Sequence, residues 1–204
     1  VTKDFSGGNY VYTCKNIQHD RKFRIKKETT TNSDGMTYFT KHTYIDDLPI
    51  SEWYDGIFAP NPYAVLLETN QIDQPIETIT GYVDNNQEYI TSGKLHLYNM
   101  VLHSEVIDSS HVNITGYHLS LNKTLNLSLT KSILDYQPIF SNGDTISYDS
   151  RYRMACSYTF DEMNRLIRIA PYGKLQTTYT WDGTYPISKT IGNQTSTFSY
   201  IPYV

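Results

Sequence analysis

Apolar and polar residues alternate along most of this chain in short stretches, and turn-forming residues separate one stretch from the next. In residues 36–44, for example, even-numbered and odd-numbered side chains fall on opposite sides of an extended backbone. Alternation with a period of two is typical of a β-strand with one buried face. Because this pattern recurs almost from end to end, the sequence predicts successive antiparallel strands.

The first predicted hairpin joins residues 21–31 to residues 36–44 through Asn32-Ser33-Asp34-Gly35. An Asp-Gly pair favours the positive φ angles of a tight turn. The basic run 21–27 is expected to begin the first of these strands, with Phe23 and Ile25 on one side and the basic side chains on the other. This interpretation makes the run a solvated strand face, which is favoured over an anion site.

Two further hairpins are expected in the middle of the chain. The first turns at residues 84–86, Asp-Asn-Asn, and its return strand contains a bulge or a second turn at Ser92-Gly93. The second places Leu119 and Leu121 opposite the leucines of residues 125–129, across a turn at residues 122–124.

Residues 51–70 interrupt the alternation and contain the one predicted helix. Asn61-Pro62 places a capping residue beside a proline at the first helical position. The sequence therefore predicts an all-β fold, an antiparallel hairpin meander that forms a twisted or curled sheet, with one short helix near residues 62–69. Residues 1–204 are expected to form a single domain.

The last third of the chain contains three pairs in which an aromatic residue precedes aspartate: Tyr148-Asp149, Phe160-Asp161 and Trp181-Asp182. Each pair places a ring at the end of a predicted strand and a carboxylate at the entry to a turn. An aspartate there accepts backbone hydrogen bonds, and the ring packs across strands. The pairs therefore have a complete structural explanation without catalysis.

The stretch 158–167, followed by Pro171-Tyr172-Gly173 and by residues 178–189, resembles the YD repeats of bacterial RHS-type proteins. The resemblance covers residues 146–191. The residues that carry it are Tyr148, Asp149, Phe160, Asp161, Asn164, Arg165, Gly173, Trp181, Asp182 and Pro186. It implies a β-sheet wall from a bacterial protein that is extracellular or belongs to the cell envelope. Long members of this group wrap such hairpins around a toxin, which needs more repeats than this chain contains.

Composition excludes some classes of function. The chain has 19 Tyr and a formal net charge of −4, so it lacks the positive field that attracts a nucleic-acid backbone. It contains no apolar stretch long enough to span a membrane. Cys14 and Cys156 have no metal-ligand spacing, and two free thiols are favoured over a disulfide.

No catalytic, metal or cofactor motif is present, and the six histidines do not have the spacing of metal ligands. Acidic residues surround Trp53 and Tyr54, and these rings with Trp181 are the candidate ligand surface, because flat rings with polar tips suit sugars. The leading hypothesis is a non-enzymatic structural or binding module whose partner is a glycan or another surface protein. Two alternatives stay open: a glycan-binding or glycan-cleaving domain, and a fragment of a toxin-delivery RHS protein.

Overall fold

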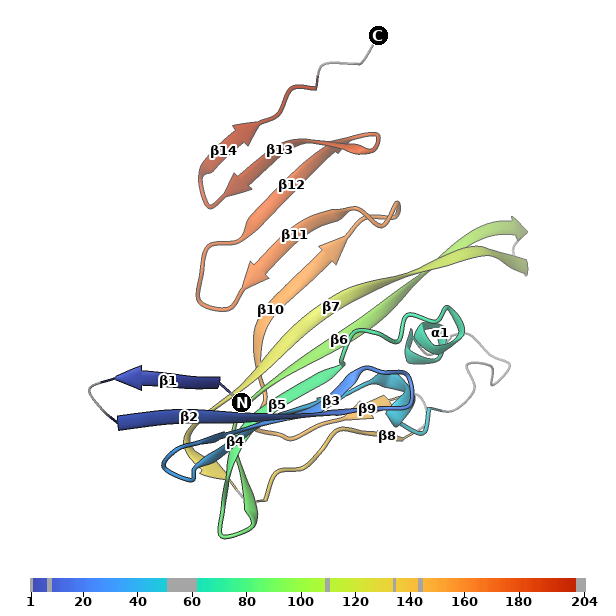
Figure 1. Ribbon diagram of the computed structural model, residues 1–204. Coiled ribbons are helices and arrows are strands. Elements are labelled where there is room, and N and C mark those ends of the chain that lie inside the picture. Colours follow the sequence, from blue (N-terminus) through green and yellow to red (C-terminus); the bar gives the residue numbers. More distant parts are fainter. Residues whose placement is uncertain are drawn as a thin grey trace. The chain divides into compact units, whose positions relative to one another are not determined.

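A computed structural model describes residues 2–6, 9–50, 62–108, 111–133, 135–142 and 145–200, and it is an all-β structure built as an antiparallel meander (Figure 1). The described elements include one short α-helix, α1, Pro62–Glu68, and one 3₁₀ turn, η1, Ile45–Asp47. The strands are β1 Thr2–Ser6, β2 Asn9–His19, β3 Ile25–Asn32, β4 Thr37–Thr43, β5 Glu77–Asp84, β6 Gln87–Asp108, β7 His111–Ile133, β8 Phe140–Asn142, β9 Thr145–Ser147, β10 Arg153–Phe160, β11 Leu166–Pro171, β12 Thr177–Asp182, β13 Tyr185–Ile191 and β14 Gln194–Thr197. No described helix is long and apolar enough to cross a bilayer.

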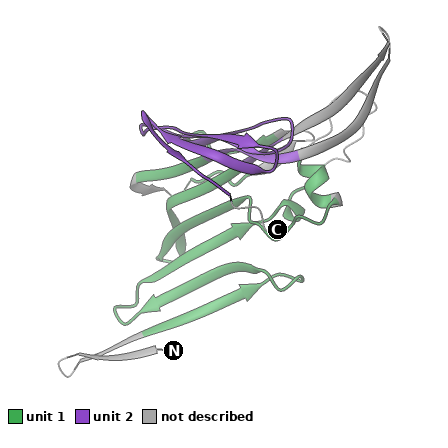
Figure 2. Cartoon of the chain, turned by 90° about the horizontal axis from the view of Figure 1, so that it is seen from above, with its two compact units in different colours: residues 1–96, 125–153 green, residues 97–124, 154–204 purple. Residues whose placement is uncertain are grey.

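The chain divides into two compact units, coloured separately in Figure 2. Unit 1 comprises residues 1–96 and 125–153, and unit 2 comprises residues 97–124 and 154–204. The long strands β6 and β7 contribute residues to both units.

Unit 1 is a meander in which strands β1 to β6 follow one another in chain order, and each pairs with the next in antiparallel fashion. The first predicted hairpin is confirmed as β3 and β4, with Gly35 at φ +83° in its turn. The turn at residues 84–86 is confirmed too, because Asn85 and Asn86 both have positive φ. Near Ser92, the pairing of β5 with β6 contains a bulge and not a second turn.

The structure shows that the strand predicted to begin in the basic run 21–27 starts later than expected. Strand β3 begins only at Ile25, and residues 20–24 form a tight turn in which Phe23 has φ +63° and is 87% exposed. Phe23 and Ile25 therefore do not share a strand face. The physical reason is Asp20, whose carboxylate accepts backbone N–H groups from within the turn and holds it closed.

The core of unit 1 lies where the helix and the segment after it meet the sheet. The predicted helix is confirmed and begins at Pro62, as its fixed φ favours. Val65 and Leu95 are fully buried, and Ile45, Ile76 and Leu127 are each 1% exposed. Burial of these side chains removes apolar area from water and stabilises the unit at about 25 cal/mol for each Å².

Unit 2 contains the predicted C-terminal meander, in which β10, β11, β12, β13 and β14 pair in chain order. Residues with positive φ occupy its turns: Asn164, Gly173, Gly183 and Gly192. These are the turns that the sequence predicted. Side chains of the last strand, β14, are all exposed.

The hairpin predicted around residues 122–124 is wrong, because β7 continues through them. None of the three residues has a positive φ, and Thr124 and Leu125 are buried. Neighbouring strands lie on both sides of β7 and satisfy its backbone, so an extended conformation is more stable there than a local turn.

Candidate functional site

Asp161 and Arg165 of the predicted motif form the closing clasp of the turn between β10 and β11. Asp161 Oδ1 accepts the backbone N–H groups of Met163 (3.0 Å) and Arg165 (2.9 Å), and Oδ2 accepts Arg165 Nε (2.7 Å). Asn164 supplies the left-handed position, at φ +56°. Asp161 is thereby held ionised, because its hydrogen bonds from Arg165 lower its pKa.

The same clasp occurs in unit 1, between β2 and β3. Asp20 Oδ1 accepts the backbone N–H groups of Lys22 (2.7 Å) and Arg24 (3.0 Å), and Oδ2 accepts Arg24 Nε (2.7 Å). Phe23 occupies the left-handed position that Asn164 has in unit 2. We call residues 20–24 and 161–165 the carboxylate–arginine turns.

The two turns also share their surroundings. A β-bulge adjoins each turn, next to the closing pairs His19–Ile25 and Phe160–Leu166. The guanidinium of Arg24 lies 4.0 Å from the centroid of the Tyr44 ring, and that of Arg165 lies 5.9 Å from the Trp181 ring.

Sequence reasoning missed the turn in unit 1. The available signal was an aspartate four residues before an arginine, with an apolar strand residue next, as in Asp20, Arg24 and Ile25 and again in Asp161, Arg165 and Leu166. Phe at the left-handed position concealed this signal, because bulky residues rarely occupy such a position.

Asp149 of the Tyr148-Asp149 pair has a different role. Its side chain is buried and accepts the backbone N–H groups of Gln137 (3.1 Å) and Arg151 (2.9 Å) and the Arg151 guanidinium (2.5 and 2.8 Å). The Arg151 hydrogen bonds hold the pKa of Asp149 well below its usual range. Asp149 therefore joins the segment around residue 137 to the segment around residue 151, while Tyr148 is exposed and packs edge-on against Tyr152.

The structure describes one of the three candidate rings. Trp53 and Tyr54 lie outside the described residues. Trp181 is half-buried, and its Nε1 donates a hydrogen bond to the carbonyl of Leu166 (3.0 Å), so its polar tip binds the neighbouring strand. Of the other motif residues, Asp182 ends β12, and the carbonyl of Pro186 accepts a hydrogen bond from Tyr200.

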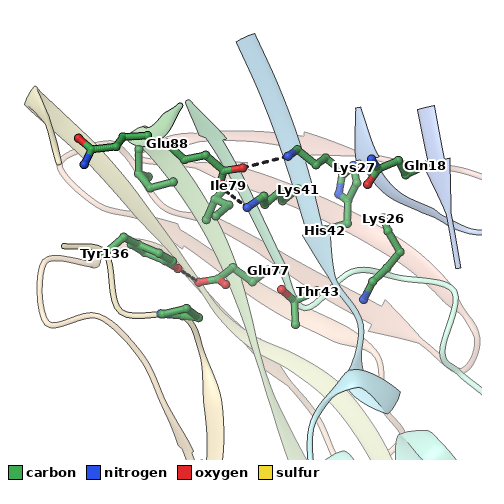
Figure 3. Close-up of a pocket in the computed structure, with 13 residues that line it drawn as sticks. Gln18, Lys26, Lys27, Lys41, His42, Thr43, Glu77, Ile79, Glu88 and Tyr136 are labelled. Carbon is green, nitrogen blue, oxygen red and sulfur yellow. Dashed lines mark hydrogen bonds and ion pairs between the residues drawn. The ribbon is translucent and has the colours of Figure 1, made fainter. Parts of the chain in front are cut away.

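A cavity of about 660 Å³ lies in unit 1, and its lining comes from strands β2 to β6 and from residues 136–138 (Figure 3). Three lysines, Lys26, Lys27 and Lys41, line it together with two acids, Glu77 and Glu88. Alternation along the strands predicted none of this, because the lining residues are distant in sequence.

Glu88 joins the two central lysines of the cavity. Its Oε1 accepts Lys27 Nζ at 2.9 Å, and its Oε2 accepts Lys41 Nζ. Burial by itself would raise the pKa of Glu88, but the Lys41 and Lys27 ammoniums outweigh that effect and lower it. Lys26 pairs with Asp47, which does not line the cavity.

Glu77 is the innermost acid of the cavity and is only 2% exposed. Its Oε1 accepts the hydroxyls of Tyr136 and of Tyr152 (2.9 Å). Burial raises the pKa of Glu77, and the hydroxyl donors only partly offset this effect. The nearby His42 has its pKa lowered by burial, so its imidazole is neutral at pH 7.

The described residues contain no cluster of three or more His, Cys, Asp or Glu side chains arranged to hold a metal ion. Cys14 and Cys156 are free thiols, the first exposed and the second half-buried.

The sequence was compared with protein-family models and with curated proteins. The chain matches no protein-family model, and no curated protein sequence matches it. The resemblance to YD repeats therefore rests on the motif residues themselves and stays a hypothesis.

Proposed function

We propose that this chain is a non-enzymatic structural and binding module of a secreted or envelope-associated bacterial protein of the RHS or YD-repeat type. The observation that carries this proposal is that ionisable side chains of the described residues hold the backbone together. Asp20, Asp161 and Asp149 each hold an arginine and close or join backbone segments. Groups engaged in this way support a scaffold and are poor candidates for proton transfer.

Two features support kinship with YD repeats. Among the described residues, a carboxylate–arginine turn occurs in each unit, with the same donors and acceptors and an adjoining bulge. The second copy lies inside the motif that resembles the repeat, and the first copy extends that pattern to residues 19–25.

The binding part of the proposal places the ligand in the cavity of unit 1. Its volume is within the range of about 300 to 1,000 Å³ that is usual for small-molecule sites. Its lining combines apolar side chains, hydroxyl and amide groups, and lysines, which suits a glycan. This cavity replaces the three rings as the first place to test.

The test is a glycan array probed with the wild-type chain and with three variants. Lys41→Gln removes a charge that lines the cavity, and Trp53→Ala removes a ring of the candidate surface. Lys15→Gln is the matched control, since Lys15 pairs with Glu28 and does not line the cavity. We expect binding that Lys41→Gln weakens and Lys15→Gln does not change. Absence of binding to any glycan would contradict the proposal that the ligand is a glycan. Loss of binding only in Trp53→Ala would indicate a site at Trp53 and not in the cavity.

Cleavage of a glycan is the second candidate function, and Glu77 is the observation that favours it. A buried carboxyl with a raised pKa on a cavity wall has the properties of a general acid. Glycosidases need a second carboxylate. The other acid of the lining is Glu88, and it is already bound by two lysines, so cleavage is the weaker of the two proposals. Release of reducing sugar from the array's binding glycans, abolished in Glu77→Gln, would replace the non-enzymatic proposal.

A further inference from the structure

Lys27 and Lys41 lie directly opposite each other on the paired strands β3 and β4. Like charges at such a position repel, so the pair needs an anion between them. Glu88 from β6 supplies it and gives one carboxylate oxygen to each ammonium, as the dashed lines in Figure 3 show. The protein thus contains a place for a planar anion with two oxygens.

This place is accessible from solvent. The side chains of Lys27, Lys41 and Glu88 are 23%, 35% and 33% exposed. Glu88 lies next to the turn at Asn85-Asn86, one residue after β6 begins. A carboxylate next to a hairpin turn gains hydration when it moves away from the lysines into water, and this gain offsets part of the lost ion pairing, which is weak for partly exposed groups.

We propose that the cavity binds a sugar that bears a carboxylate, a uronic acid, and that the sugar carboxylate displaces Glu88 from Lys27 and Lys41. This inference deepens the proposed function and rests on the chain being a binding module. Glu88 acts as the internal substitute for the ligand when the cavity contains only solvent.

The carboxylate is favoured over other anions by the geometry of the substitute. Each oxygen of Glu88 has one ammonium partner, and the two partners come from adjacent strands at fixed register. A ligand carboxylate reproduces both contacts. A sulfate or phosphate group is tetrahedral and carries a third oxygen that has no counterpart in the Glu88 carboxylate.

The remainder of the lining matches a sugar ring. Ile79, Ile90 and Pro138 supply apolar surface, and Gln18, Gln87 and Thr43 carry amide and hydroxyl groups. A pyranose has an apolar face of C–H groups and an edge of hydroxyls, so both parts of the lining have a counterpart on the ligand.

The charges of the cavity agree with this ligand. Three lysines face two carboxyl groups in a chain whose formal net charge is −4, and burial keeps Glu77 protonated over a wider pH range than a free glutamate. A ligand carboxylate takes over both ion pairs when it displaces Glu88, whereas an ester or a neutral sugar leaves Glu88 in place and binds without these charge-assisted contacts. Removal of the competing carboxylate therefore strengthens binding.

The experiment is isothermal titration calorimetry with trigalacturonic acid, its methyl ester and the neutral galactose trisaccharide as probes. We expect the wild-type chain to bind the acid at least roughly tenfold more tightly than the ester or the neutral sugar, as is usual for a charge-assisted contact. Glu88→Gln should tighten binding of the acid, Lys27→Gln should weaken it, and Lys15→Gln should leave it unchanged. Circular dichroism and the thermal midpoint establish that each variant is folded, and the comparison of acid with ester needs no variant.

Equal binding of acid, ester and neutral sugar would overturn the inference and leave the binding module intact. Tighter binding of a sulfated trisaccharide than of trigalacturonic acid would overturn it too. Absence of binding to all four probes would also refute it, whereas the proposed function is judged separately by the glycan array. Weaker binding of the acid to Glu88→Gln would show that Glu88 contributes to the site and is not displaced.

Discussion

Phe23 and Asn164 occupy the same position in the two carboxylate–arginine turns, with φ angles of +63° and +56°. Asparagine tolerates the left-handed region, whereas phenylalanine, which is bulky and has no polar group to hydrogen-bond locally, is strained there. The side chain of Phe23 is 87% exposed, so burial offsets little of this strain. The clasp formed by Asp20 and Arg24 holds the strained residue in place.

At the residue scale we therefore expect Phe23→Asn to stabilise the chain by about 1 kcal/mol, because the variant keeps the turn and removes most of the left-handed penalty. Urea unfolding measures this as a higher midpoint with an unchanged slope. The reciprocal variant Asn164→Phe is the matched control and should lower the midpoint by a similar amount. A lower midpoint in Phe23→Asn would mean that the ring makes a stabilising contact.

At the element scale, the hairpin of β5 and β6 depends on a close approach at Gly81. A Cβ atom placed there would lie 2.0 Å from the backbone oxygen of Tyr89 and 2.7 Å from the Phe39 ring. The bulge in this pairing brings the two backbones together, so only glycine fits. At Gly93 the same added atom would meet the hydroxyl end of Tyr152, at 2.5 Å.

Gly81→Ala should therefore destabilise the chain by at least about 2 kcal/mol, because backbone and a buried ring would both have to move. Gly93→Ala is the comparison, since the clash there is with the end of one side chain and not with the backbone, and it should therefore cost less. Thermal and urea unfolding measure both effects. A loss for Gly81→Ala no larger than that for Gly93→Ala would contradict the assignment of the clash to the backbone.

At the scale of the whole molecule, carboxylates bound by arginine or lysine recur in unit 1 and in unit 2. The pKa is lowered for Asp20, Asp46, Glu88, Asp149 and Asp161. For such groups the unfolded chain binds more protons than the folded chain at low pH. Their contribution to stability is present above the unfolded pKa values, near 4, and is lost as the pH falls through the folded values. Glu77 has the opposite sign, because its pKa is raised.

We accordingly expect the free energy of unfolding to fall steeply as the pH drops from about 5 to about 2. Urea unfolding at a series of pH values provides the measurement. Asp149→Asn should make the loss of stability with falling pH shallower, because Asp149 is the most deeply buried of the five. A free energy of unfolding that stays level or rises toward pH 3 would contradict the stabilising role of these carboxylates.

Sequence reasoning recovered most strands and turns because their signals are local. Alternation identified strands β3 and β4, and the pairs Asp34-Gly35 and Asn85-Asn86 identified turns whose φ angles only a few residue types adopt readily. It failed where a residue was strained or where neighbours decided the outcome. Phe23 gave no turn signal, and the polar residues 122–124 gave a false one.

The motif residues Asp161 and Arg165 could be found from sequence, but the cavity could not. Its central lysines and Glu88 come from three strands, and they meet only because of the register of each strand with its neighbour. No spacing along the chain indicates that register, since a shift of one residue would move each side chain to the other face.

By itself, therefore, the sequence determined that this protein is all-β, where most of its strands turn back, and that aspartates occupy turn entries. These properties depend on the backbone preferences of single residues and on a period of two, which act over a few residues. Only the tertiary structure decided that Asp20 and Asp161 make the same clasp, that β7 passes through residues 122–124 without a turn, and that Lys27, Lys41 and Glu88 meet at one cavity. Those outcomes depend on strand register and on partners distant in the chain, whose interaction energies no local pattern contains.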